Sequence, residues 1–62
     1  MRILLWQKRI AKGYSVRELS RLSGISKTSI NDIENNKISP TIKTVEALAK
    51  ALECSFFDMF EE

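Results

Sequence analysis

The stretch Ser15–Lys37, SVRELSRLSGISKTSINDIENNK, decides the fold of this chain. Ser15 and Ser26 each stand where a helix can begin, because their hydroxyls can accept hydrogen bonds from the first unpaired N–H groups. Gly24 lies between them and tolerates the positive φ that a sharp turn requires. The stretch therefore predicts two short helices joined by a tight turn, the layout of a helix-turn-helix.

Further turn signals divide the rest of the chain into segments of helical character. Glycines, an asparagine pair and the single proline separate runs whose apolar residues recur at the helical period. Ser15 with Glu18, and Ser55 with Asp58, have the spacing of capping boxes. No run alternates with period two, so we expect no sheet. Residues 1–62 are predicted to form one all-α domain with five helices, at about Ile3–Lys12, Ser15–Ser23, Ser26–Asn35, Thr41–Leu52 and Ser55–Phe60.

Composition narrows the possible functions. The 62 residues carry a formal net charge of +2, one cysteine and no histidine, which excludes a Cys/His zinc site and a histidine-based triad. Glycine-rich phosphate loops and catalytic carboxylate clusters are not found either, so no enzyme activity, metal or cofactor is expected. The apolar start Ile3–Trp6 is too short for a signal peptide or a membrane span. We expect a soluble, cytoplasmic protein, in which Cys54 packs as a small apolar residue.

The spacing around the turn strengthens the helix-turn-helix interpretation. Ser20 is small where two crossing helices must approach, and Gly24 supplies the turn. The inward positions are then apolar, at Leu19, Ile25, Ile30 and Ile33. A generic helical hairpin in a bundle remains the alternative, since each of these features alone is common.

Taken together, these residues resemble the Cro/CI-type helix-turn-helix (XRE) family of phage repressors and small bacterial regulators. The resemblance rests on Arg9, Lys12-Gly13, Ser15, Glu18-Leu19, Gly24-Ile25-Ser26, Ile30, Ile33-Glu34, Lys37, Pro40-Thr41 and the segment Leu52 to Phe60. It implies a lambda-repressor-like domain that binds double-stranded operator DNA, as a homodimer, to regulate transcription, with repression the expected mode. A prokaryotic, phage or plasmid origin is implied as well. Whether the 62 residues are a whole regulator or part of a larger one stays open.

Four positions depart from the family pattern. Val16 stands where the family usually has a glutamine that touches a phosphate, a contact that Arg17 is expected to take over. Ser23 replaces an apolar residue before the turn glycine. Asn36 and Glu53 stand where glycine is common. These departures affect local details of the expected fold.

The resemblance assigns DNA base contacts to the exposed face of the helix that begins at Ser26. The chemistry of that face suits base edges: lysine donates to guanine, asparagine pairs with adenine, aspartate accepts from cytosine, and the threonine methyl meets that of thymine. The alternative is an ordinary solvated helix face. The candidate base-reading residues are Lys27, Thr28, Asn31 and Asp32.

Candidate phosphate contacts flank this helix. Side chains and N–H groups at helix starts and in the following loop can hold a phosphate. Isolated surface lysines are common in any protein, which is the alternative explanation. The candidates are Arg17, Ser29, Lys37, Ser39 and Lys43.

One further pair is expected to be structural. In the family, an arginine on the first helix and a glutamate at the end of the third form a partly buried ion pair. Arg9 and Glu34 match those two positions. By this resemblance, they fix the third helix against the first.

Aromatic and apolar residues crowd both ends of the chain. Ile3 and Trp6 lie near one end, and the candidate dimer interface Phe56, Phe57, Met59 and Phe60 lies near the other. These residues either pack together and extend the core, or form a surface for a partner. A homodimer is the expected partner arrangement. The rival function is a protein-interaction module, such as an antitoxin subunit or adaptor, that uses this aromatic surface.

Overall fold

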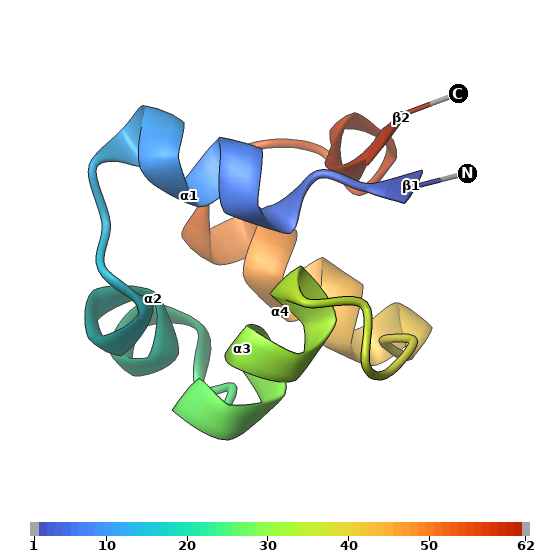
Figure 1. Ribbon diagram of the computed structural model, residues 1–62. Helices are drawn as coiled ribbons and strands as arrows, with labels where there is room; N and C mark the ends of the chain where they lie inside the picture. The colour runs from blue at the N-terminus through green and yellow to red at the C-terminus, as the bar shows by residue number, and fades with distance from the viewer. Residues whose placement is uncertain (1, 62) are drawn as a thin grey trace.

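In the computed structural model, residues 2–61 are described, and they form a bundle of short helices closed by a small sheet (Figure 1). The bundle surrounds one core, and both chain ends lie at the same side of it (Figure 1). The elements in chain order are β1(Arg2–Ile3), α1(Leu5–Lys12), α2(Val16–Ser23), α3(Lys27–Glu34), α4(Ile42–Ala51), the 3₁₀ turn η1(Phe57–Met59) and β2(Phe60–Glu61).

Local sequence signals set the helix starts. Ser15, Ser26 and Thr41 adopt extended backbone conformations, and each side-chain oxygen accepts a hydrogen bond from the N–H group three residues on. Ser15 and Ser26 are the expected N-caps, and Thr41 caps the helix that was expected to begin near it. Gly24 ends α2 with φ at 77°, in the left-handed region, and its N–H donates to the carbonyl of Ser20. The predicted helix-turn-helix is therefore present at the predicted residues.

The expectation of an all-helical C-terminus without a sheet is wrong. Ser55 and Asp58 do form a reciprocal capping box, with N···O distances of 3.1 and 3.4 Å. The helical turn ends after three residues, because Phe60 is extended and pairs antiparallel with Ile3. The expected fifth helix is thus one 3₁₀ turn, and Ile3 belongs to a strand. The first helix begins at Leu5 instead.

The core gathers apolar side chains from each α-helix and from η1. Its buried members are Leu5, Leu19, Ile30, Ile33, Val45, Leu48, Ala49, Leu52 and Met59. Met59 is 0% exposed, so its assignment to a dimer interface is wrong. The cause is the 3₁₀ turn, which directs this side chain inward. Partly buried Cys54 packs against the core, and its Sγ lies 3.5 Å from Sδ of Met59.

Two positions where the family has glycine keep the glycine conformation. Asn36 has φ at 59° and Glu53 has φ at 57°. Each stands just after a helix, where a left-handed residue reverses the chain. Asparagine tolerates this region better than glutamate does. Glu53 is therefore the more strained of the two positions.

Among residues 2–61, no helix is long and apolar enough to cross a membrane. Over the same residues, no three acidic, cysteine or histidine side chains gather as metal ligands would.

Candidate nucleic-acid interface

The α2–turn–α3 unit lies at the end of the molecule opposite the two chain termini (Figure 1). The inner face of α3 is buried through Ile30 and Ile33, and α3 packs against both α2 and α1. These contacts fix the rotation of α3 about its own axis. The residues on its other face must therefore point to solvent.

The outward face of α3 is polar. Lys27, Thr28 and Asn31 are exposed, and their spacing places them on neighbouring positions of one helix face. Asp32 is partly buried. The structure therefore brings three of the four candidate base-reading residues to an open surface, with Asp32 at its margin.

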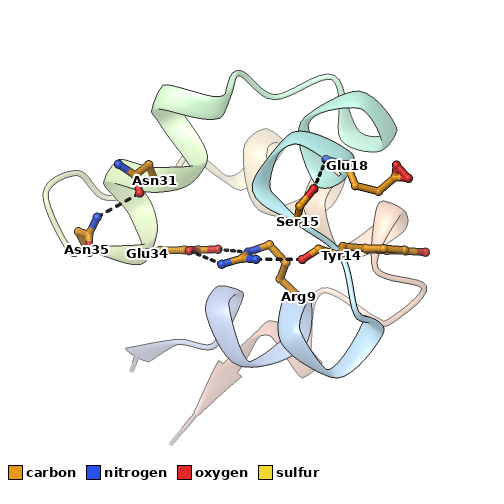
Figure 2. A network of polar contacts seen from close by, with 7 residues as sticks. All are labelled: Arg9, Tyr14, Ser15, Glu18, Asn31, Glu34 and Asn35. Carbon is orange, nitrogen blue, oxygen red and sulfur yellow. Dashed lines mark hydrogen bonds and ion pairs between the residues drawn. The ribbon is translucent and has the colours of Figure 1, made fainter.

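Asn31 is held by a neighbour on the same helix face. Its Oδ1 accepts a hydrogen bond from Nδ2 of Asn35 at 3.3 Å (Figure 2). This bond limits the side-chain rotamers of Asn31. The amide nitrogen of Asn31 and a second lone pair on Oδ1 stay available, which is what two hydrogen bonds to an adenine edge require.

The candidate phosphate contacts lie around this face. Arg17, Lys37, Ser39 and Lys43 are all exposed, and Ser29 is partly buried. The Ser29 Oγ accepts a hydrogen bond from Oγ of Ser26 at 2.9 Å. Ser29 and Ser39 line one hollow of about 250 Å³ where the starts of α3 and α4 meet. The structure thus brings these two serines together, while Lys37 and Lys43 stand in the loop and helix that follow α3.

A second hollow runs along α2 and contains a residue that the sequence analysis missed. This groove of about 560 Å³ is lined by Ser15, Arg17, Glu18, Ser20, Arg21 and Lys27. Arg21 lies one helical turn after Arg17, and this i, i+4 spacing was the available signal. Its Nη2 donates to both carboxylate oxygens of Glu18, at 3.0 and 3.1 Å.

Arg9 and Glu34 form the ion pair that connects α1 with the end of α3. The Nε of Arg9 donates to Oε2 of Glu34 at 2.7 Å, and Nη2 donates to Oε1 at 3.0 Å. A third donor, Nη1, binds the carbonyl oxygen of Tyr14 at 2.9 Å (Figure 2). The two side chains are only 11% and 8% exposed. Hydrogen bonding to Glu34 raises the pKa of Arg9, against an opposing effect of burial. The arginine thus stays charged and ties three segments together.

The aromatic residues near the chain ends have different environments. Phe56 packs against Phe57 and Phe60, with ring centroids 5.5 and 5.4 Å apart, and both Phe56 and Phe60 are partly buried. Phe57 is 81% exposed and Trp6 is 51% exposed. Only Phe57 among the four C-terminal candidates is therefore open enough to lie at the centre of a contact.

A helical domain that presents a short polar helix after a glycine turn, anchored by a buried ion pair, belongs to the helix-turn-helix class. The chain is a member of the HTH_3 (XRE) helix-turn-helix family, whose model matches residues 7–59. This family assignment agrees with the resemblance that the sequence analysis derived from individual residues.

Named relatives support the same assignment. The HTH-type transcriptional regulator PuuR of Escherichia coli is 37% identical over 51 residues, which are 82% of this chain and 28% of PuuR. The HTH-type transcriptional regulator SinR of Bacillus subtilis is 33% identical over 57 residues, or 90% of this chain and 51% of SinR. This chain therefore spans between about a quarter and half of the length of these relatives.

Solved structures share the fold at closely similar geometry. An HTH_3 family transcriptional regulator from Vibrio cholerae has a TM-score of 0.87 at 38% identity, covering 90% of this chain and 32% of that one. A chain of the complex between the SinR and SinI proteins has a TM-score of 0.87 at 32% identity, covering 94% of this chain and 57% of that one.

Proposed function

We propose that this protein binds double-stranded DNA of a specific sequence through α3 and regulates transcription as a repressor. The observation that carries the proposal is the outward face of α3: Lys27, Thr28 and Asn31 stand exposed on a helix whose inner face is fixed. Family membership and the names of the relatives, all HTH-type transcriptional regulators, point the same way. The protein would then act in the compartment that holds the DNA, the prokaryotic cytoplasm.

The proposed contacts follow from side-chain chemistry. An α-helix fits the major groove, where Lys27 donates to guanine, Asn31 pairs with adenine and the Thr28 methyl meets thymine. Asp32 accepts from cytosine N4 at the edge of the contact. Arg17, Ser29, Lys37, Ser39 and Lys43 hold the phosphates on either side and set the register of α3. Repression is the simplest outcome, because a domain bound at a promoter excludes other proteins from the same DNA.

We further propose that two copies bind one operator. A single short helix contacts too few bases for tight specific binding, whereas two copies read half-sites about 34 Å apart, one turn of the duplex. Phe57 would lie in the contact between the copies, since it is the most exposed large apolar side chain of the chain's described part. Solution mass and stoichiometry on DNA, for the wild type and Phe57→Glu, test this arrangement. A Phe57→Glu protein that pairs on DNA like the wild type would contradict it.

The second candidate function is a protein-interaction module. The exposure of Phe57 and Trp6 favours it, and the similar SinR occurs in a complex with SinI. In that case, the aromatic surface binds a different protein and binding to DNA is weak. The dimer measurement and a selection of bound sequences from random DNA separate the two candidates.

Selection of bound sequences from a random duplex pool tests the proposed function. The wild type should enrich a short consensus with palindromic symmetry. Thr28→Ala/Asn31→Ala serves as the matched control, because both residues are exposed and their removal leaves the core intact. The control should enrich a weaker or different consensus. Absence of any enrichment by the wild type would leave the interaction module as the better account.

A further inference from the structure

The groove along α2 concentrates the charge of the molecule. Its lining contains the cations Arg17, Arg21 and Lys27 and the single carboxylate of Glu18, a net charge of +2. The whole chain also has a formal net charge of +2, so the charges outside the groove cancel. Lys27 belongs at the same time to the outward face of α3. The groove therefore continues the proposed base-reading surface onto α2.

Within this groove, Arg21 forms an ion pair with Glu18. The ion pair between them is open to solvent, with side chains 68% and 37% exposed. Exposed pairs of this kind contribute little to stability. Arg21 can therefore leave Glu18 at small cost when a stronger anion approaches.

Glu18 has another position available. The Ser15 Oγ accepts from the N–H of Glu18 at 3.0 Å, which is half of a capping box. The other half requires the carboxylate to accept from the N–H of Ser15. Figure 2 shows the Glu18 carboxylate turned away from Ser15 instead. A carboxylate released from Arg21 can turn back and complete the box.

We propose that Arg21 is a further phosphate-binding residue and that Glu18 is its intramolecular competitor. On DNA, the Arg21 guanidinium moves from the Glu18 carboxylate to a backbone phosphate beside the groove, and Glu18 turns to the N–H of Ser15. The ion pair thus lowers the affinity for all DNA and makes binding depend more on the base contacts of α3. This inference rests on the proposed function.

Arg21→Gln and Glu18→Gln test the two roles by equilibrium binding to the selected duplex and to unrelated DNA, across a range of salt concentrations. Arg21→Gln should weaken binding to both duplexes about three- to tenfold and reduce the salt slope by about one. Glu18→Gln should strengthen binding to both about two- to fivefold. Among residues 2–61, Arg2 and Glu61 form a second exposed arginine–glutamate pair, at 3.1 Å, which provides controls with the same charge changes. Arg2 and Glu61 lie in β1 and β2, away from α2 (Figure 1). Arg2→Gln and Glu61→Gln should therefore change DNA affinity much less.

The double variant Glu18→Gln/Arg21→Gln shows whether Glu18 acts through Arg21. In the Arg21→Gln background, the gain from Glu18→Gln should disappear. A gain that persists unchanged would overturn the competitor role, and Arg21→Gln binding like Arg2→Gln would overturn the phosphate role. In both cases the wild type still binds its site through α3, so the proposed function stands. If the wild type binds no duplex at all, both proposals are overturned.

Discussion

The guanidinium of Arg9 meets the carboxylate of Glu34 with two hydrogen bonds, of 2.7 and 3.0 Å, across the gap between α1 and the end of α3. Its third hydrogen bond holds the carbonyl of Tyr14, in the segment that leads into α2. The Arg9 side chain therefore connects α1, the segment before α2 and the end of α3, and so fixes the orientation of α3. We therefore expect this pair to act by fixing the position of α3, since side chains only 11% and 8% exposed offer little surface to DNA.

Removal of Glu34 should destabilise the fold strongly. Glu34→Ala leaves the nearly buried Arg9 without its partner, which costs on the order of 3 kcal/mol in unfolding free energy. Thermal and urea unfolding measure the loss. The exposed ion pair between Arg2 and Glu61 supplies the control, since Glu61→Ala should lower the unfolding free energy by well under about 1 kcal/mol. Replacement of both Arg9 and Glu34 by apolar residues should recover part of the loss. Equal stabilities of the Glu34→Ala and Glu61→Ala proteins would show that the buried pair contributes no more to folding stability than the exposed one.

Gly24 and Glu53 both have positive φ, so removing glycine at Gly24 should destabilise the fold and introducing glycine at Glu53 should stabilise it. A Cβ at Gly24 meets no atom within 4 Å, so Gly24→Ala is destabilising through its positive φ alone, by about 1 kcal/mol. Glu53→Gly should stabilise by about as much, less a few tenths for the lost ion pair with Lys12. Chemical denaturation of both variants checks the signs. Stabilisation by Gly24→Ala would be incompatible with the backbone geometry described.

Met59 and Phe57 should differ sharply, although they lie two positions apart. Met59→Ala removes a fully buried side chain and should cost about 2–5 kcal/mol. Met59→Leu keeps the volume and should cost less than about 1.5 kcal/mol. Phe57→Ala changes an exposed ring and should alter the unfolding free energy of the monomer by no more than about 0.5 kcal/mol. The reverse order of effects would mean that η1 has the opposite orientation.

Cys54 should make stability depend on pH in the alkaline range. Burial raises the pKa of its thiol, with smaller opposing effects from Lys8 and Lys12. The neutral thiol therefore favours the folded state, and this contribution is fully present below the pKa of the unfolded thiol. It is lost as the pH rises from that value through the higher pKa of the folded state. Urea midpoints of the wild type should fall more between neutral and alkaline pH than those of Cys54→Ala. Parallel curves for the two proteins would show that the thiol titrates normally.

Local sequence signals made most of the fold predictable, whereas the pairing of segments far apart in the sequence could not be predicted. Ser15, Ser26 and Thr41 cap helices through hydrogen bonds to residues three positions on, which sequence alone reveals. The β1–β2 pairing was not predictable, because strands of two residues have no measurable period and join opposite ends of the chain.

The candidate site shows the same limit. Sequence patterns indicated which residues of α3 are polar, and the exposure of Lys27, Thr28 and Asn31 followed from the buried positions of Ile30 and Ile33. The inward turn of Met59 depends on the 3₁₀ geometry. The groove around Arg21 depends on how α2 and the start of α3 meet. Both required the assembled structure.

Equilibrium binding of Asn31→Ala and Lys37→Ala, measured on the selected duplex and on single-base substitutions of it, tests the central claim most directly. Asn31→Ala should lose about 1–3 kcal/mol on the selected duplex and should no longer distinguish bases at one position of each half-site. Lys37→Ala should weaken binding to every duplex by the same factor and reduce the salt slope by about one. Base discrimination in Asn31→Ala identical to that of the wild type would contradict the assignment of α3 as the helix that reads the DNA sequence.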